Sequence, residues 1–150
     1  MGLFSKIFGR FEPRHIELTD LGAFRSTRHG TWNGHLALPG HEAPIPVILA
    51  GAPEPPSDAQ HAFLLELRGR FEELEAAMAR TLFEGIDPLD DGSSPEQVFA
   101  HMRLLRLHIP ADASPPATWE LSYEHTQDQG EHLFTVHMLG WEHQGFSMDG

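Results

Sequence analysis

The chain of 150 residues contains no cysteine. Disulfide bonds, thiolate-bound zinc and cysteine nucleophiles are therefore excluded, as is usual for proteins of a reducing compartment. No apolar run approaches the ~18 residues that a membrane-spanning helix requires. The first residues also lack the apolar core and the small-residue cleavage site of a secretory signal. We therefore expect a cytoplasmic protein without a transmembrane segment.

Positive charge is scarce, and Lys6 is the only lysine. Ten basic residues stand against 22 acidic ones, which leaves a net charge of −12. A surface of this sign repels phosphate backbones, so nucleic-acid binding is not expected. It attracts basic proteins and accelerates their association, so we expect a protein partner to be basic.

Residues 1–13 are predicted to be a basic, apolar segment ahead of a single domain that covers residues 14–150. Apolar residues recur in this segment at helical spacing, as in helices that lie in a membrane surface. The same pattern suits a helix that caps the core or contacts a protein partner. The candidate contact residues are Leu3, Phe4, Ile7, Phe8 and Phe11.

Alternation of apolar and polar residues predicts strands over 15–19, 31–38, 103–109, 118–125 and 132–139. A nearly all-apolar run predicts a further strand over 45–50, and the last strand is expected over 141–148. Pro46 suggests that its strand lies at an edge of the sheet or contains a bulge. Leu105, Leu107 and Ile109 are expected to share one face of their strand. The alternation over 118–125 leaves one face polar, which favours an antiparallel sheet.

A long helix is predicted over about residues 57–86, where apolar residues form one stripe three or four positions apart. Ser57 and Gln60 have the spacing of a capping box at its start. A short helix over about 95–102 is predicted after Ser94 and Pro95. The expected fold class is α+β: a mainly antiparallel sheet with both helices packed on one face.

Three of the eleven histidines, His132, His137 and His143, lie within residues 130–143. Side chains alternate along a strand, so His132 and His137 point to opposite faces and cannot bind the same ion. His137 is expected on the open face of the sheet, because Phe134 and Val136 have the parity of the core face.

The open face of the sheet is the candidate binding surface. Its predicted residues are Asn33, His35, Arg106, His108, Glu120, Ser122, Glu124, Thr135 and His137. This surface is open to three interpretations: a plain solvent face, a protein-binding face, or a metal or acid–base site. In the last case His108, His137 and Glu120, or Glu124 in its place, would be the metal ligands or the acid–base pair.

Three short motifs carry a resemblance to known families. They are Trp32-Asn33-Gly34, the Pro55-Pro56-Ser57…Gln60 entry to the long helix, and the closing Phe146-Ser147-Met148-Asp149-Gly150. Together they resemble small bacterial families of domains of unknown function. Families similar to these sometimes lie beside secreted toxin systems, in which small acidic proteins act as immunity partners. The resemblance implies no catalytic residue and no cofactor.

The chain contains no Gly-x-Ser-x-Gly, no phosphate-binding glycine loop and no His-Glu-x-x-His. Our leading hypothesis is therefore a non-enzymatic interaction domain, of the immunity type, that binds a basic toxin. Glu120, Glu124 and the Glu72–Glu75 cluster would supply its negative charge. One alternative is a metal-dependent enzyme that uses the open-face histidines and carboxylates. Another is a peripheral membrane adaptor that acts through residues 1–11.

Overall fold

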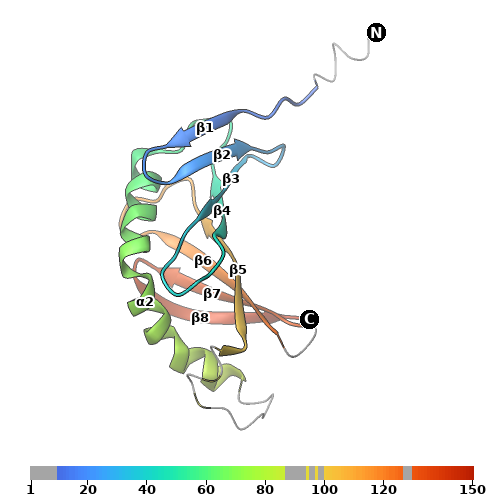
Figure 1. The fold of residues 1–150 in the computed structure, drawn as a ribbon, viewed down its shortest axis with the longest axis vertical. Helices are drawn as coiled ribbons and strands as arrows, with labels where there is room; N and C mark the ends of the chain where they lie inside the picture. Colours follow the sequence, from blue (N-terminus) through green and yellow to red (C-terminus); the bar gives the residue numbers. More distant parts are fainter. Residues whose placement is uncertain (1–9, 87–93, 95–96, 98–99, 127–129) are drawn as a thin grey trace.

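The computed structural model describes residues 10–86, 94, 97, 100–126 and 130–150, and within the long helix it describes side chains up to Ala79. The elements in chain order are β1 (His15–Leu18), β2 (Gly22–Ser26), β3 (Thr31–Leu36), β4 (Ile45–Ala50), α2 (Asp58–Ile86), β5 (Met102–Ile109), β6 (Thr118–His125), β7 (Leu133–Leu139) and β8 (Glu142–Asp149). They form one sheet with a single long helix beside it (Figure 1).

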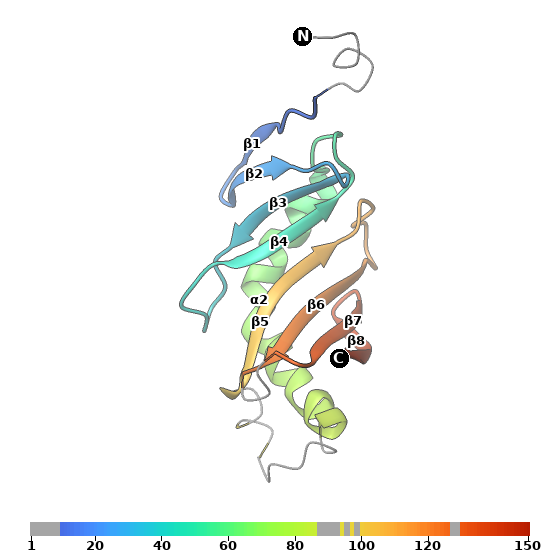
Figure 2. The same cartoon turned by 90° about the vertical axis from the view of Figure 1, so that its right-hand side faces the viewer.

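The eight strands lie in the sheet in the same order as in the chain. Every neighbouring pair is antiparallel except β4 and β5, which are parallel and pair Val47–Leu49 with Leu107–Ile109. A parallel pair needs a crossover connection, and α2 is that connection. The prediction of a mainly antiparallel sheet with the long helix on one face is therefore confirmed (Figures 1 and 2).

The core lies between α2 and the face of the sheet that α2 covers. The stripe of α2 is buried from Leu64 to Met78, where its side chains are described. Strand β2 adds Phe24 beneath it, and each strand from β3 to β7 adds alternate apolar residues. The largest fully buried side chains are Trp32, Trp119, Tyr123, Phe24, Phe71 and Phe134. Trp32 and Trp119 donate their indole N–H groups to the carbonyl oxygens of Glu54 and Gly140, each over 2.7 Å.

The capping box predicted at the start of α2 is present. The Ser57 amide donates to Oε1 of Gln60 over 3.0 Å, and the Gln60 amide donates to Oγ of Ser57 over 3.1 Å. The side chain of Gln60 is itself buried and donates through Nε2 to the carbonyl oxygens of Ala50 and Pro110. It therefore joins the ends of β4 and β5 to the start of the helix.

Three details differ from the sequence predictions. Strand β2 was not predicted, because Phe24 is its only large apolar residue. Pro46 lies in β4, which is an inner strand rather than an edge; β5 pairs only with Val47–Leu49, so the missing N–H of Pro46 lies outside that ladder. A register shift between Leu104 and Arg106 places Leu104, rather than Leu105, on the core face with Leu107.

The second, short helix is not shown. Residues 95–96 and 98–99 lie outside the described part of the chain, and Met102 already belongs to β5. The predicted cap is seen in the described residues, because the Ser94 amide donates to Oε1 of Gln97 over 2.7 Å. No helix among the described residues is long and apolar enough to cross a membrane.

Candidate functional site

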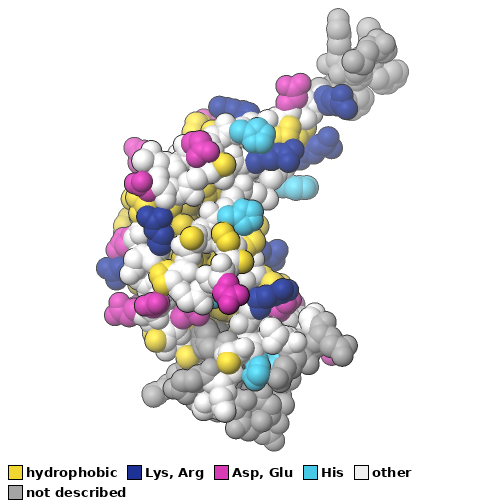
Figure 3. All heavy atoms as spheres, viewed as in Figure 1, with side chains coloured by type: hydrophobic (Ala, Val, Ile, Leu, Met, Phe, Trp, Pro, Cys, Tyr) yellow, Lys and Arg dark blue, Asp and Glu magenta, His cyan; other side chains and the backbone are white. Residues whose placement is uncertain are grey.

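The face of the sheet opposite α2 carries the predicted binding residues. In β3 the buried side chains of Trp32 and Leu36 point toward α2, whereas Asn33 and His35 are exposed on the other face. Figure 2 views the sheet with α2 behind it, and no described element lies across the front. This open face is hollowed on the right-hand side of the molecule in Figure 3.

The strand order brings the predicted open-face residues together in rows. The first row contains one residue from each strand from β2 to β7, and each residue is paired with the next: Arg25, Asn33, Ile48, His108, Glu120 and His137. A second row joins β5 to β8: Arg106, Ser122, Thr135 and Ser147. His35 lies opposite Pro46, and Glu124 lies opposite Arg103. All nine predicted residues thus share one surface, although the side chain of Ser122 is buried.

Strands β6 to β8 carry a chain of three polar side chains on this face. Glu120 Oε1 lies 3.2 Å from Nδ1 of His137, and Nε2 of the same ring lies 3.2 Å from Oγ of Ser147. Glu120, His137 and Ser147 come from β6, β7 and β8. The carboxylate therefore orients the imidazole, and the imidazole contacts the hydroxyl.

Most of the open face is a groove whose charged side chains are mostly basic. Two adjoining hollows, of about 750 and about 450 Å³, share Thr27, His29 and Asn33 and together run from β2 to β7. The charged or titratable residues that line them are Arg25, Arg28, His29, His35, Arg106, His108 and Glu120. We call this surface the basic groove; cationic and histidine side chains cluster there in Figure 3.

No carboxylate among the described residues makes an ion pair with an arginine of the basic groove. Within the described residues, Arg25, Arg28 and Arg106 form no ion pair. The guanidinium of Arg28 lies over the ring of Phe11, 5.8 Å from its centroid. Among the described residues that line the groove, Glu120 is the only carboxylate, and it contacts His137. The groove is therefore positive on a chain whose net charge is −12.

The acidic residues predicted to attract a basic partner are divided between two regions. On the open face, Glu120 contacts His137 and Glu124 forms an ion pair with Arg103. On α2, Glu72 and Glu73 are exposed on the opposite side of the molecule. The Glu72–Glu75 cluster is thus separated from the open face by the thickness of the helix and the sheet.

Glu75 differs from its neighbours on α2 because it turns inward. Its side chain is only 20% exposed and forms an ion pair with His41 in the β3–β4 connection. Burial raises the pKa of the Glu75 carboxyl above its ordinary value, and the contact with His41 opposes this shift. Burial, and then the charge of Glu75, raises the pKa of the Tyr123 phenol well above its ordinary value. The phenol therefore stays protonated.

The three histidines of residues 130–143 do not converge. His137 lies on the open face, whereas His143 pairs with Met138, whose side chain is buried beneath α2. In the register, Glu120 lies between His108 and His137. Across the part of the chain that is described, no three His, Asp or Glu side chains are arranged so that they could hold a metal ion.

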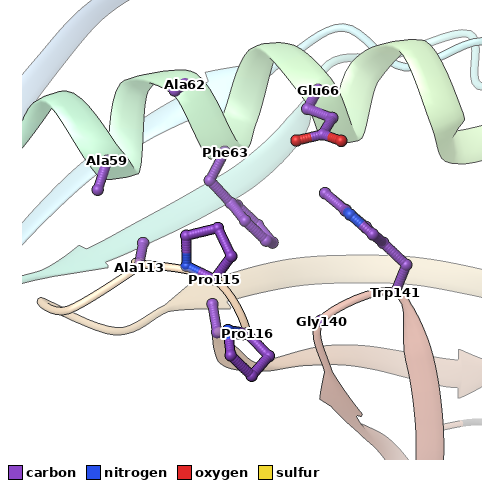
Figure 4. Close-up of a pocket in the computed structure, with 10 residues that line it drawn as sticks. Ala59, Ala62, Phe63, Glu66, Ala113, Pro115, Pro116, Gly140 and Trp141 are labelled. Carbon is purple, nitrogen blue, oxygen red and sulfur yellow. The ribbon is translucent and has the colours of Figure 1, made fainter.

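A second surface feature, an apolar pocket, lies at the edge of the face that α2 covers (Figure 4). It has a volume of about 240 Å³ and lies between the first turns of α2, the β5–β6 connection and the β7–β8 turn. Its lining residues are Ala59, Ala62, Phe63, Glu66, Ala113, Pro115, Pro116, Ala117, Gly140 and Trp141. We call it the Trp141 pocket.

The candidate membrane segment lies mostly outside the described residues. Leu3, Phe4, Ile7 and Phe8 belong to residues 1–9, and only Phe11 of this set is described. Phe11 is half-buried against Arg28 and lines the basic groove. The membrane-adaptor hypothesis therefore stays a prediction.

Sequence reasoning missed parts of both surfaces. Arg25 was overlooked because its strand was not predicted, and Arg28 and His29 because they lie between β2 and β3, outside every predicted strand. Phe63 and Trp141 come from distant parts of the chain, and their contact has no signal in the local pattern. No protein-family model matches the chain, and comparisons with curated proteins and with solved structures give no match.

Proposed function

We propose that the protein is a non-enzymatic interaction domain that binds an acidic, extended segment of a partner protein in its basic groove. The observation that carries this proposal is a set of three arginines that form no ion pair with a described residue, Arg25, Arg28 and Arg106, on an otherwise acidic chain. Charges of one sign in a concave surface attract a ligand of the opposite sign and set its orientation.

The shape of the groove favours a polypeptide segment over a small molecule. It is an open hollow that runs across neighbouring strands, whereas small-molecule sites are usually deep and mostly enclosed. Thr31, Asn33 and Thr135 place hydroxyl and amide groups along the groove. These groups can hydrogen-bond to a peptide backbone, while the arginines pair with carboxylates, often through two N–H groups at once.

The partner segment that we propose is acidic, whereas the net charge of the chain predicts a basic partner. An acidic segment is repelled by the chain as a whole, but screening limits that repulsion to about 10 Å at ordinary salt. The arginines of the groove lie within this distance of a bound segment, whereas the exposed carboxylates of α2 lie on the other side of the sheet. An immunity-type complex with a basic toxin would instead use the α2 side, through Glu72 and Glu73.

Fluorescence anisotropy with labelled oligoglutamate and oligolysine peptides tests this proposal. We expect oligoglutamate to bind, and Arg25→Glu with Arg106→Glu to weaken binding at least about tenfold, or ~1.4 kcal/mol. Arg68→Glu is the matched control, because Arg68 lies on α2 and should leave binding unchanged. Tight binding of oligolysine that is lost in Glu72→Lys with Glu73→Lys would replace the proposal with the basic-partner alternative.

The chain of Glu120, His137 and Ser147 favours a second candidate function, acyl transfer. His137 would take the proton from the Ser147 hydroxyl as its oxygen bonds to an ester carbonyl carbon. The ester C–O bond breaks, the proton passes to the leaving alcohol, and water releases the acyl group. Hydrolysis of p-nitrophenyl acetate that is lost in both Ser147→Ala and His137→Gln would support this function. Equal rates in all three proteins would exclude it.

A further inference from the structure

The walls of the Trp141 pocket are almost entirely carbon. Phe63 and Trp141 stack nearly parallel, with ring centroids 5.0 Å apart and an interplanar angle of 8°. Pro115 and Pro116 lie across from these rings, and small alanine side chains leave the space between them open (Figure 4). Flat faces and small side chains around a narrow space suit a flat, apolar ligand.

The indole of Trp141 differs from the other two in the chain. Trp32 and Trp119 are buried and donate to backbone carbonyls, whereas the N–H of Trp141 makes no hydrogen bond to a described residue. Phe63 lies against Trp141, and the guanidinium of Arg70 lies 5.2 Å from the centroid of its ring. Phe63 and Arg70 thus hold the indole of Trp141 in place, and its N–H can donate a hydrogen bond to a ligand.

The mouth of the pocket carries one charged group. Glu66 lines it, and its carboxylate points toward Trp141 in Figure 4. Arg70 pairs with Glu66 over 3.1 Å but does not line the pocket. Because Glu66 lines the pocket and Arg70 does not, a ligand in the pocket contacts the carboxylate, which favours a cationic ligand over an anionic one.

We propose that the Trp141 pocket is a binding site for a small aromatic molecule that carries an amine and no negative charge. A volume of about 240 Å³ exceeds the ~150 Å³ apolar cavity that holds benzene in an engineered protein, so a two-ring system fits. The aromatic body packs between Phe63 and the prolines, and the ammonium group lies beside Glu66. This site is independent of the basic groove.

Nuclear magnetic resonance of the indole N–H groups tests the proposal directly. Three probes share one ring system: tryptamine is cationic, indole is neutral and indole-3-acetate is anionic. We expect tryptamine to give a saturable shift of the Trp141 signal at lower concentration than indole, and indole-3-acetate to be weakest. The Trp32 signal is the internal reference, because its N–H is bound to Glu54 outside the pocket.

Two variants separate the pocket from other surfaces. Ala59→Phe places a ring into the pocket and should abolish the shift, because Ala59 is half-buried and points toward Ala113 in Figure 4. Ala76→Phe adds the same ring at an exposed position of α2 outside the lining. Glu66→Gln should bring tryptamine and indole to similar affinity. The proposal is overturned if no probe shifts Trp141 at millimolar concentration, or if Ala59→Phe binds as well as the unaltered protein.

Discussion

The two faces of the same sheet carry opposite chemistry at alternate residues of the same strands. Beneath α2, the strands contribute Trp32, Leu107 and Trp119, which are at most 1% exposed. On the open face, the positions beside them hold Asn33, His108 and Glu120, which line the basic groove. One side therefore holds the fold together, and the other side carries the residues of the binding surface that we propose.

Residues that stabilise the fold and residues of the proposed binding surface thus alternate along the same strands. Burial of apolar area is the main source of folding free energy, so changes on the covered face should unfold the protein. Exposed polar residues contribute little to stability, so changes on the open face should leave the fold intact. Paired variants on the two faces measure how complete that separation is.

Leu107→Ala should cost about 2–5 kcal/mol of unfolding free energy, because it leaves a cavity beneath α2. The neighbouring His108→Ala, on the open face, should change stability by less than ~0.5 kcal/mol. Urea denaturation followed by circular dichroism measures both variants. Equal losses in the two variants would show that the open face also carries folding energy.

Gly34→Ala should cost about 1–3 kcal/mol, although it adds only one methyl group. A Cβ at this covered-face position would lie 2.6 Å from ring atoms of Phe24, which is too close. Thermal unfolding measures the loss. Phe24→Leu made in the same chain should offset part of it, so the double variant should be more stable than the sum of the two single losses predicts.

Glu75→Gln should change the pH dependence of stability. The folded-state pKa of Glu75 is raised by burial, so its contribution is fully present below the ordinary pKa and is lost as pH rises through the raised value. The glutamine variant lacks this loss and should be the more stable protein at neutral pH. The difference should vanish in acid. Denaturation midpoints across a pH series measure it, and a constant difference would contradict the assignment.

Much of the covered face could be predicted from the sequence, because buried positions recur with the period of the helix or the strand. That period appears in the sequence as regularly spaced apolar residues. The stripe of α2 and the alternation of Trp119, Leu121 and Tyr123 have this origin. The register shift at Leu104–Arg106 could not be predicted, since two leucines in succession fit either face. The open-face residues were correctly assigned to a face, but their adjacency depended on strand order, which local patterns do not encode.

The Trp141 pocket escaped prediction for a different reason. Its walls come from three segments that are far apart in the sequence, and each segment alone looks like a helix start, a proline-rich connection or a turn. Only the packing of α2 against the later strands brings Phe63 and Trp141 together. Concave sites between elements are in general a property of the packed chain.

The single parallel pairing also has a consequence for how the chain folds. Strands β1–β4 and β5–β8 are two runs of sequential neighbours, so most of their contacts are local in sequence and form fast. The short ladder between Val47–Leu49 and Leu107–Ile109 closes a much longer loop. We therefore expect this seam to form late and to open first, so amide hydrogens along it should exchange before those at the centre of either half.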